Sequence, residues 1–133
     1  MLSPLKILIV DDDQDDQAFL LEAINELYPS SQCNVVDNGG EALQYIEKNP
    51  PPPSLVFLDL NMPVVNGFEF LRDFKKKEDY KNSVVIIYTT SSHARDKEIS
   101  KDLGAAEYIT KISDYTKLKT VLSDVVGRIC KDV

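Results

Sequence analysis

The chain has 133 residues, a hydrophobic content of 43%, a charged content of 28% and a formal net charge of −7. This length suits one globular domain, and the composition is that of an ordinary folded protein. The negative charge argues against nucleic-acid binding, which needs a basic surface. We therefore expect a single domain over residues 1–133, with no second domain to act as its output.

The amino-terminal apolar run, Ile7 to Val10, is too short for a signal sequence or a membrane span. We therefore expect a cytoplasmic protein that is not attached to a membrane. The two cysteines, Cys33 and Cys130, lack the spacing of a metal site. In a reducing compartment they are expected to be free thiols.

In chain order, a β-branched apolar run predicts a strand at residues 6–10, and apolar residues at helical spacing predict a helix at residues 14–28. A weak strand at residues 34–36 is followed by an Asn-Gly-Gly turn and a helix around residues 42–46. Residues 50–53 are consecutive prolines, which form a stiff connector. This connector leads into residues 55–59, which have the uninterrupted apolar character of a strand buried on both faces.

After this strand, Gly67 is predicted to take a positive φ or to permit a close backbone approach before a helix at residues 68–74. A strand at residues 84–88, a helix at 93–103 ended by Gly104, and a strand at 105–110 follow. Ser113 is the predicted N-cap of a last helix that reaches residue 129. Strands that alternate with helices indicate an α/β fold, here a doubly wound five-stranded parallel sheet flanked by five helices.

Four of these strands end in groups that can act on a ligand. The central strand ends in Asp59, and Pro63 shortly after it cannot continue a strand ladder. The first strand is followed by Asp11 and Asp12; the other two groups are Thr89, after the fourth strand, and Lys111, after the fifth. Because the strands are predicted to be parallel, all these ends lie at one edge of the sheet, where open α/β sheets bind ligands.

The residue types at this edge predict phosphoryl chemistry. Carboxylates of Asp11, Asp12 and Asp59 would repel one another without a cation, and oxygen ligands of this kind select Mg²⁺. A free oxygen of Asp59 is then a candidate nucleophile for a phosphoryl group. The ammonium of Lys111 and the hydroxyl of Thr89 could stabilise the phosphoryl oxygens.

Four segments of the chain resemble the CheY-like response-regulator receiver domains of two-component signalling: ILIVDDD, LVFLDLNMPVVNGFEFL, VIIYTTS and AAEYITK. Their relative spacing is also similar, since Thr89 lies 30 positions and Lys111 lies 52 positions after Asp59. The resemblance runs along essentially the whole chain. It implies a flavodoxin-like sheet with strand order 2-1-3-4-5 in a stand-alone regulator of single-domain type.

The same resemblance implies a role for each matching residue. Asp59 would accept the phosphoryl group from a sensor histidine kinase, a phosphotransfer protein or a small-molecule donor. Mg²⁺ would be bound by Asp12 and Asp59 directly, by Asp11 through water and by the backbone carbonyl of Asn61. Such a protein catalyses only its own phosphorylation and dephosphorylation, and it is otherwise not an enzyme.

The output of such a module is a change of surface. Thr89 and Lys111 would bind the phosphoryl oxygens, and Tyr108 occupies the place of the family's switch aromatic. The face formed by the fourth helix, fifth strand and fifth helix would then be presented to a downstream protein target. A homodimer through that face is one form of partner that stays open.

Two other functions stay open at this point, and one position departs from the family. A haloacid-dehalogenase-type phosphatase also uses a strand-end aspartate, but it needs a second acid where this chain has Asn61. A receiver-like scaffold that is never phosphorylated is the other alternative. Ile112 follows Lys111 where the family usually has proline, which makes the loop after Lys111 strained or differently built.

Overall fold

A computed structural model describes residues 5–62 and 66–129 of the chain. The predictions made for Pro63 and Cys130 lie outside the described residues. Within them, Cys33 is a free cysteine, as predicted. No described helix is long and apolar enough to cross a membrane.

Five parallel strands form one sheet in the order β2-β1-β3-β4-β5, as predicted. The three inner strands, β1, β3 and β4, are buried almost throughout, whereas the edge strands β2 and β5 are partly exposed. Inner strands of parallel sheets have both faces covered, which explains their continuous apolar runs. The strands span β1 Lys6–Val10, β2 Gln32–Val36, β3 Leu55–Leu58, β4 Val84–Thr89 and β5 Glu107–Thr110.

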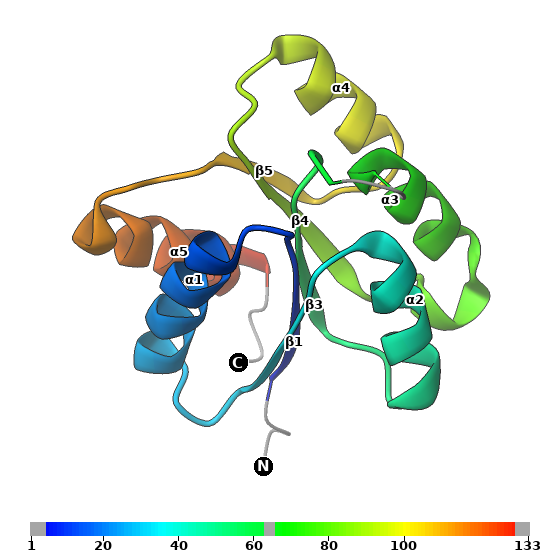
Figure 1. The fold of residues 1–133 in the computed structure, drawn as a ribbon, viewed down its shortest axis with the longest axis horizontal. Coiled ribbons are helices and arrows are strands. Elements are labelled where there is room, and N and C mark those ends of the chain that lie inside the picture. The colour runs from blue at the N-terminus through cyan, green and yellow to red at the C-terminus, as the bar shows by residue number, and fades with distance from the viewer. Residues whose placement is uncertain (1–4, 63–65, 130–133) are drawn as a thin grey trace.

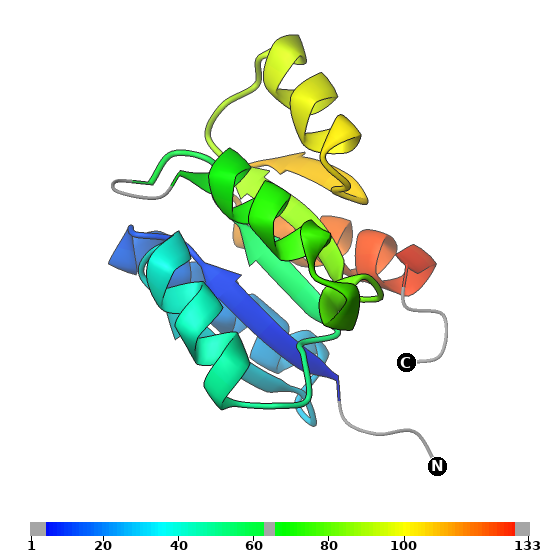
Figure 2. The same ribbon diagram turned by 90° about the vertical axis from the view of Figure 1, so that its right-hand side faces the viewer.

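Helices cover both faces of the sheet (Figure 1). Helices α1 and α5 pack on one face, and α2, α3 and α4 cover the other, which faces the viewer in Figure 2. Each face has its own apolar cluster, and alternate residues of a strand belong to different clusters. The helices span α1 Gln14–Leu27, α2 Gly39–Lys48, α3 Gly67–Lys76, α4 Ala94–Asp102 and α5 Tyr115–Ile129, with a short 3-10 helix at Glu78–Tyr80.

Several predicted boundaries differ from the structure by one to three residues. Strand β2 begins at Gln32, two residues before the prediction, because pairing with β1 continues to the Lys6–Gln32 register. The two glycines predicted as a turn are the first residues of α2, because the Asn38 side chain accepts the backbone N–H of Glu41 and caps the helix. Strand β5 begins at Glu107 rather than at residue 105.

The last helix is capped by a different residue from the one predicted. Helix α5 begins at Tyr115, and Asp114 directly precedes it. The side chain of Asp114 accepts the backbone N–H of Lys117 at 2.9 Å, and its carbonyl accepts the N–H of Leu118. Asp114 therefore does what was predicted for Ser113, since the N-cap residue is the one whose side chain satisfies the first free N–H groups.

Two glycines have the roles that the sequence indicated. Gly104 follows α4 with φ 109°, the left-handed conformation in which a helix commonly ends. Gly67 permits a close approach: a Cβ atom there would lie 2.5 Å from the carbonyl oxygen of Asp59 and 2.6 Å from Cα of Leu60. The start of α3 is therefore packed directly on the backbone that carries Asp59.

Candidate functional site

The register of the sheet brings the strand ends together. Val10 pairs with Leu58, so the next residues, Asp11 and Asp59, leave β1 and β3 side by side. The backbone N–H of Asp59 donates to the carbonyl of Val10 at 2.9 Å, which extends the ladder to the aspartate itself. The backbone N–H of Lys111 donates to the carbonyl of Thr89 at 2.7 Å and joins the ends of β4 and β5 in the same way.

Three carboxylates converge at this edge. Oxygen atoms of Asp11, Asp12 and Asp59 all lie within 4.8 Å of one another. Asp11 and Asp59 are buried, with 3% and 5% of their surface exposed, whereas Asp12 is exposed. A cluster with one open, hydrated side and only oxygen donors fits a hard divalent cation that keeps some of its waters. The carboxylates predicted to bind metal are thus together in one place.

Lys111 is the cation inside this acidic cluster. Its Nζ lies 2.7 Å from Oδ2 of Asp16, 2.9 Å from Oδ2 of Asp11 and 3.1 Å from Oδ2 of Asp59. Burial alone would lower the pKa of Lys111, but hydrogen bonds to Asp16 and Asp11 and the charge of Asp59 outweigh it, so the pKa is raised. The ammonium therefore stays charged and holds β1, β3 and α1 together at the site.

The buried carboxyl of Asp11 has an altered acidity. Burial raises its pKa to about 6, although the backbone N–H of Asp13 and the ammonium of Lys111 both favour the charged form. The Asp13 N–H donates to Oδ1 of Asp11 at 3.0 Å. A proton and a metal ion would compete for this side chain near pH 6.

Thr89 and Asn61 are positioned next to Asp59. Thr89 is completely buried at the end of β4, and its hydroxyl oxygen accepts the side-chain amide of Asn61 at 3.4 Å. The backbone N–H of Asn61 donates to Oδ1 of Asp59 at 3.1 Å. The predicted phosphate-binding hydroxyl thus reaches the nucleophile candidate through one intervening side chain.

Tyr108 connects the site to its neighbouring surface. Its hydroxyl donates to the carbonyl of Ser91, two residues after Thr89, at 2.8 Å. The ring is half-buried against the α2, α3 and α4 side of the sheet, and the ammonium of Lys97 on α4 lies 5.7 Å from its centre. The side chain predicted as the switch is therefore in contact with both the loop after Thr89 and α4.

Two features around Lys111 were not foreseen. Asp16 is not among the predicted site residues, yet it makes the shortest of the three contacts to Lys111. The only signal for it was its place in the first turn of a helix that begins at the same edge of the sheet. Ile112 does not displace the lysine, and its peptide N–H points to the hydroxyl of Tyr88 at 3.5 Å. The peptide bond before Ile112 is trans, since Pro50–Pro51 is the only cis peptide bond in the described part of the chain.

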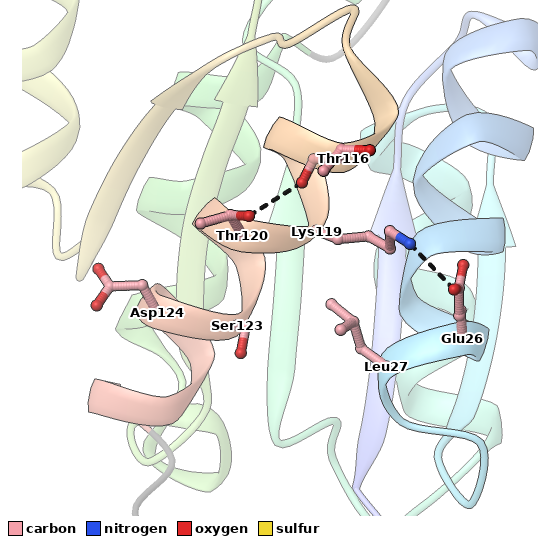
Figure 3. A pocket seen from close by; sticks show the side chains of 7 residues that line it. All are labelled: Glu26, Leu27, Thr116, Lys119, Thr120, Ser123 and Asp124. Carbon is pink, nitrogen blue, oxygen red and sulfur yellow. Dashed lines mark hydrogen bonds and ion pairs between the residues drawn. The ribbon is translucent and has the colours of Figure 1, made fainter.

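A groove between α1 and α5 lies away from these residues (Figure 3). Its volume is about 600 Å³, and hydroxyl and charged side chains line it. The ammonium of Lys119 in this groove is paired with Glu26 at 3.0 Å, as Figure 3 shows. No predicted site residue lines the groove.

Comparison with known proteins agrees with this geometry. Residues 7–123 match the family model of the response regulator receiver domain. The chain belongs to this family. Receiver domains act in two-component signal transduction, where they interact with histidine kinases or phosphotransfer proteins and with downstream targets. The phosphatase alternative finds no support.

Individual relatives agree in sequence and in fold. Protein PilH of Pseudomonas aeruginosa is 33% identical over 123 residues, which cover 92% of this chain and 98% of PilH. The crystal structure of the phosphorylated cyanobacterial phytochrome response regulator RcpA superposes with a TM-score of 0.88 at 27% identity, covering 98% of this chain and 97% of RcpA. The Mn²⁺-bound form of response regulator Rcp1 has a TM-score of 0.81 at 26% identity, covering 90% of this chain and 93% of Rcp1.

Other relatives are much longer than this chain. The chain is 31% identical to a probable cyclic di-GMP phosphodiesterase of Vibrio cholerae, and the match covers 99% of this chain but 29% of that protein. Receiver domains are generally non-catalytic signalling modules, and some are joined to enzyme domains. The binding of a divalent metal is a property of the family, as the Mn²⁺-bound Rcp1 structure illustrates, and the Asp11, Asp12 and Asp59 cluster fits it.

Proposed function

We propose that this domain is a phosphorylation-controlled switch in a two-component phosphorelay and that Asp59 is its phosphoacceptor. The observation that carries the proposal is the placement of the Asp59 carboxylate. It is buried at the end of the central strand β3, within 3.1 Å of the Lys111 ammonium and inside the three-carboxylate cluster.

The proposed reaction transfers one phosphoryl group. A carboxylate oxygen of Asp59 attacks the phosphorus of a phosphohistidine or of acetyl phosphate, and a new P–O bond forms. The bond to the donor's imidazole nitrogen or acetate oxygen breaks, and the donor keeps that electron pair. Lys111 then offers its ammonium, and Thr89 its hydroxyl, to the phosphoryl oxygens, and both groups stabilise the negative charge of the transferred group.

For the metal, we propose Mg²⁺ bound by Asp12 and Asp59, by Asp11 through water and by the backbone carbonyl of Asn61. Oxygen ligands without histidine or thiolate favour Mg²⁺, which, when bound, neutralises charge on the phosphoryl oxygens. The side chain of Lys111 would then share the site with a second cation.

The proposed output runs from Thr89 to Tyr108. On phosphorylation the Thr89 hydroxyl would leave the Asn61 amide for a phosphoryl oxygen and draw the loop after β4 with it. Because the Tyr108 hydroxyl is bonded to the Ser91 carbonyl in that loop, its ring would turn inward. The α4, β5 and α5 face would then change shape and bind a downstream protein or a second copy of this chain.

Intact-protein mass after incubation with acetyl phosphate tests the acceptor. Wild type should gain one phosphoryl group in the presence of Mg²⁺ and none in EDTA. Asp59→Asn should gain none, whereas Asp13→Asn, which removes a carboxylate outside the metal cluster, should behave as wild type. Beryllofluoride, which mimics the phosphoryl group, should bind wild type and not Asp59→Asn.

Two outcomes would contradict the proposal. A chain that neither gains mass from acetyl phosphate and a histidine-kinase donor nor binds beryllofluoride would be a receiver-like scaffold. An adduct that persists in Asp59→Asn would place the acceptor elsewhere.

A further inference from the structure

The ammonium of Lys111 is fully used before any phosphoryl group arrives. A lysine ammonium has three N–H donors, and here three carboxylates, those of Asp11, Asp16 and Asp59, lie within 3.1 Å of Nζ. Phosphorylation turns the Asp59 carboxylate into an uncharged acyl group, so the contact that Lys111 makes with Asp59 passes to the phosphoryl group. A second bond from Lys111 to the phosphoryl oxygens requires Asp11 or Asp16 to give one up.

The two remaining carboxylates differ in what their release would cost. The Asp11 side chain is 4% exposed, so it would be left as a buried charge with one fewer partner. The Asp16 side chain is 38% exposed and can be solvated by water once the contact breaks. Asp16 is thus the carboxylate that Lys111 can leave most easily.

The surroundings of Asp16 leave room for this exchange. A cavity of about 460 Å³ beside Lys111 is bordered by Asp16, Phe19, Tyr88 and Ile112. The backbone of Asp16 is fixed, because its N–H donates to the capping side chain of Asp13 at 3.0 Å. The side chain can therefore rotate towards this cavity while the first turn of α1 stays in place.

We propose that Asp16 is a positioning residue that competes with the phosphoryl group for the Lys111 ammonium. This inference rests on the proposed function of Asp59. Before phosphorylation, Asp16 holds the ammonium towards α1; on phosphorylation, a phosphoryl oxygen takes the place of the Asp16 carboxylate. Asp16 therefore weakens the phosphorylated state relative to the unphosphorylated one.

Beryllofluoride titration at saturating Mg²⁺ tests this competition. Asp16→Asn should bind beryllofluoride about three- to tenfold more tightly than wild type, since one charged hydrogen bond no longer has to be exchanged. The matched control is Asp15→Asn, which removes the same charge from the same helical turn. Asp15 is exposed and, in the described part of the chain, makes no ion pair with Lys111. Asp15→Asn should bind beryllofluoride within about twofold of wild type, because exposed charges interact weakly through water. Asp16→Glu, which keeps a carboxylate at this position, should return the affinity to the wild-type value.

A second measurement separates positioning from a change of net charge. The ¹⁵N and ¹H resonances of the Lys111 ammonium, recorded without ligand, should shift in Asp16→Asn and stay unchanged in Asp15→Asn. Equal affinities and equal spectra of these two variants would overturn the inference while leaving Asp59 as the acceptor. If wild type and both variants all failed to bind beryllofluoride and to accept phosphoryl groups, the proposed function itself would be wrong, and this inference would fall with it.

Discussion

The carboxyl edge of the sheet has two halves that differ in their contact with water. The inner half is buried and consists of Asp11, Asp59 and Thr89. The outer half is open to solvent and consists of Asp12, Asp16 and Asn61. Both halves consist mainly of the same residue type, and Asp11 and Asp12 are neighbours in the chain. Burial, rather than chemical identity, distinguishes what each half can do.

This difference shows how one edge can be both rigid and adaptable. In the inner half, an unpaired charge would be costly, so each group is tied to a backbone N–H, to Lys111 or to another side chain. In the outer half, water can replace a lost partner. Exchange of ligands is therefore expected on the outer side, and the reacting atom on the inner side.

Metal binding should involve carboxylates of both halves, and it should have the largest effect on the free energy of unfolding. At a Mg²⁺ concentration 100-fold above the dissociation constant, the free energy of unfolding should rise by about 2.7 kcal/mol, because only the folded chain gathers Asp11, Asp12 and Asp59. Urea unfolding with Mg²⁺ and with EDTA measures the difference. An equal rise in Asp59→Asn would show that the stabilising metal binds elsewhere.

The stability and the metal affinity of the inner half should depend on the close packing of Gly67 against the Asp59 backbone. Gly67→Ala would place a methyl group 2.5 Å from the Asp59 carbonyl, and we expect a loss of about 1–3 kcal/mol in the free energy of unfolding together with weaker Mg²⁺ binding. The matched control is Gly127→Ala on the exposed side of α5, where nothing lies within 4 Å. That change should stabilise the helix by about 0.5–1 kcal/mol. Similar results for both variants would mean that Gly67 does not support the site.

The outer half should contribute to metal affinity without contributing to folding. Asp12→Asn should weaken Mg²⁺ binding about tenfold or more, since one charged ligand of the cluster is lost. Urea unfolding in EDTA should change little, because Asp12 is exposed. Asp13→Ala, which removes the neighbouring N-cap of α1, should have the reverse pattern. Its free energy of unfolding should fall by about 0.5–2 kcal/mol, and isothermal titration should show nearly normal Mg²⁺ binding.

A further expected effect is a dependence of stability on pH that belongs to the inner half. The pKa of Asp11 is about 6 in the folded chain against an ordinary value of 3.8, so between these values the folded state holds a proton that the unfolded state has lost. In EDTA, the free energy of unfolding should therefore fall as pH rises through this window, relative to Asp11→Asn. If the free energy of unfolding rose instead, the folded chain would favour the charged form of Asp11.

Much of this arrangement could be predicted from the sequence, because a parallel sheet brings the ends of its strands to one edge. That rule alone placed Asp11 beside Asp59 and Lys111 beside Thr89. The resemblance to receiver domains then supplied the strand order and the roles that stay proposals, including those of Tyr108 and of the Asn61 carbonyl.

What could not be predicted depends on contacts between distant segments. Asp16 and Lys111 are 95 positions apart, and an acid in the first turn of a helix is ordinarily explained by the helix dipole. Strand β2 includes the polar residue Gln32 because its neighbour β1 continues the ladder, and local propensity cannot indicate a partner's length. Asp114 rather than Ser113 caps α5, since adjacent polar residues are equally suitable until the backbone geometry is known.

The alternation of side chains along β4 determines which face of the sheet the Thr89 side chain points to. Tyr88 belongs to the apolar cluster beneath α1 and α5, whereas Ile87, like Tyr108 beside it on β5, belongs to the cluster on the opposite face. Thr89, two residues from Ile87, points to that same opposite face. A pull on the Thr89 hydroxyl would thus be transmitted first to the layer that holds α4. The domain would receive its input at the carboxyl edge of the sheet and pass it to one of the two faces.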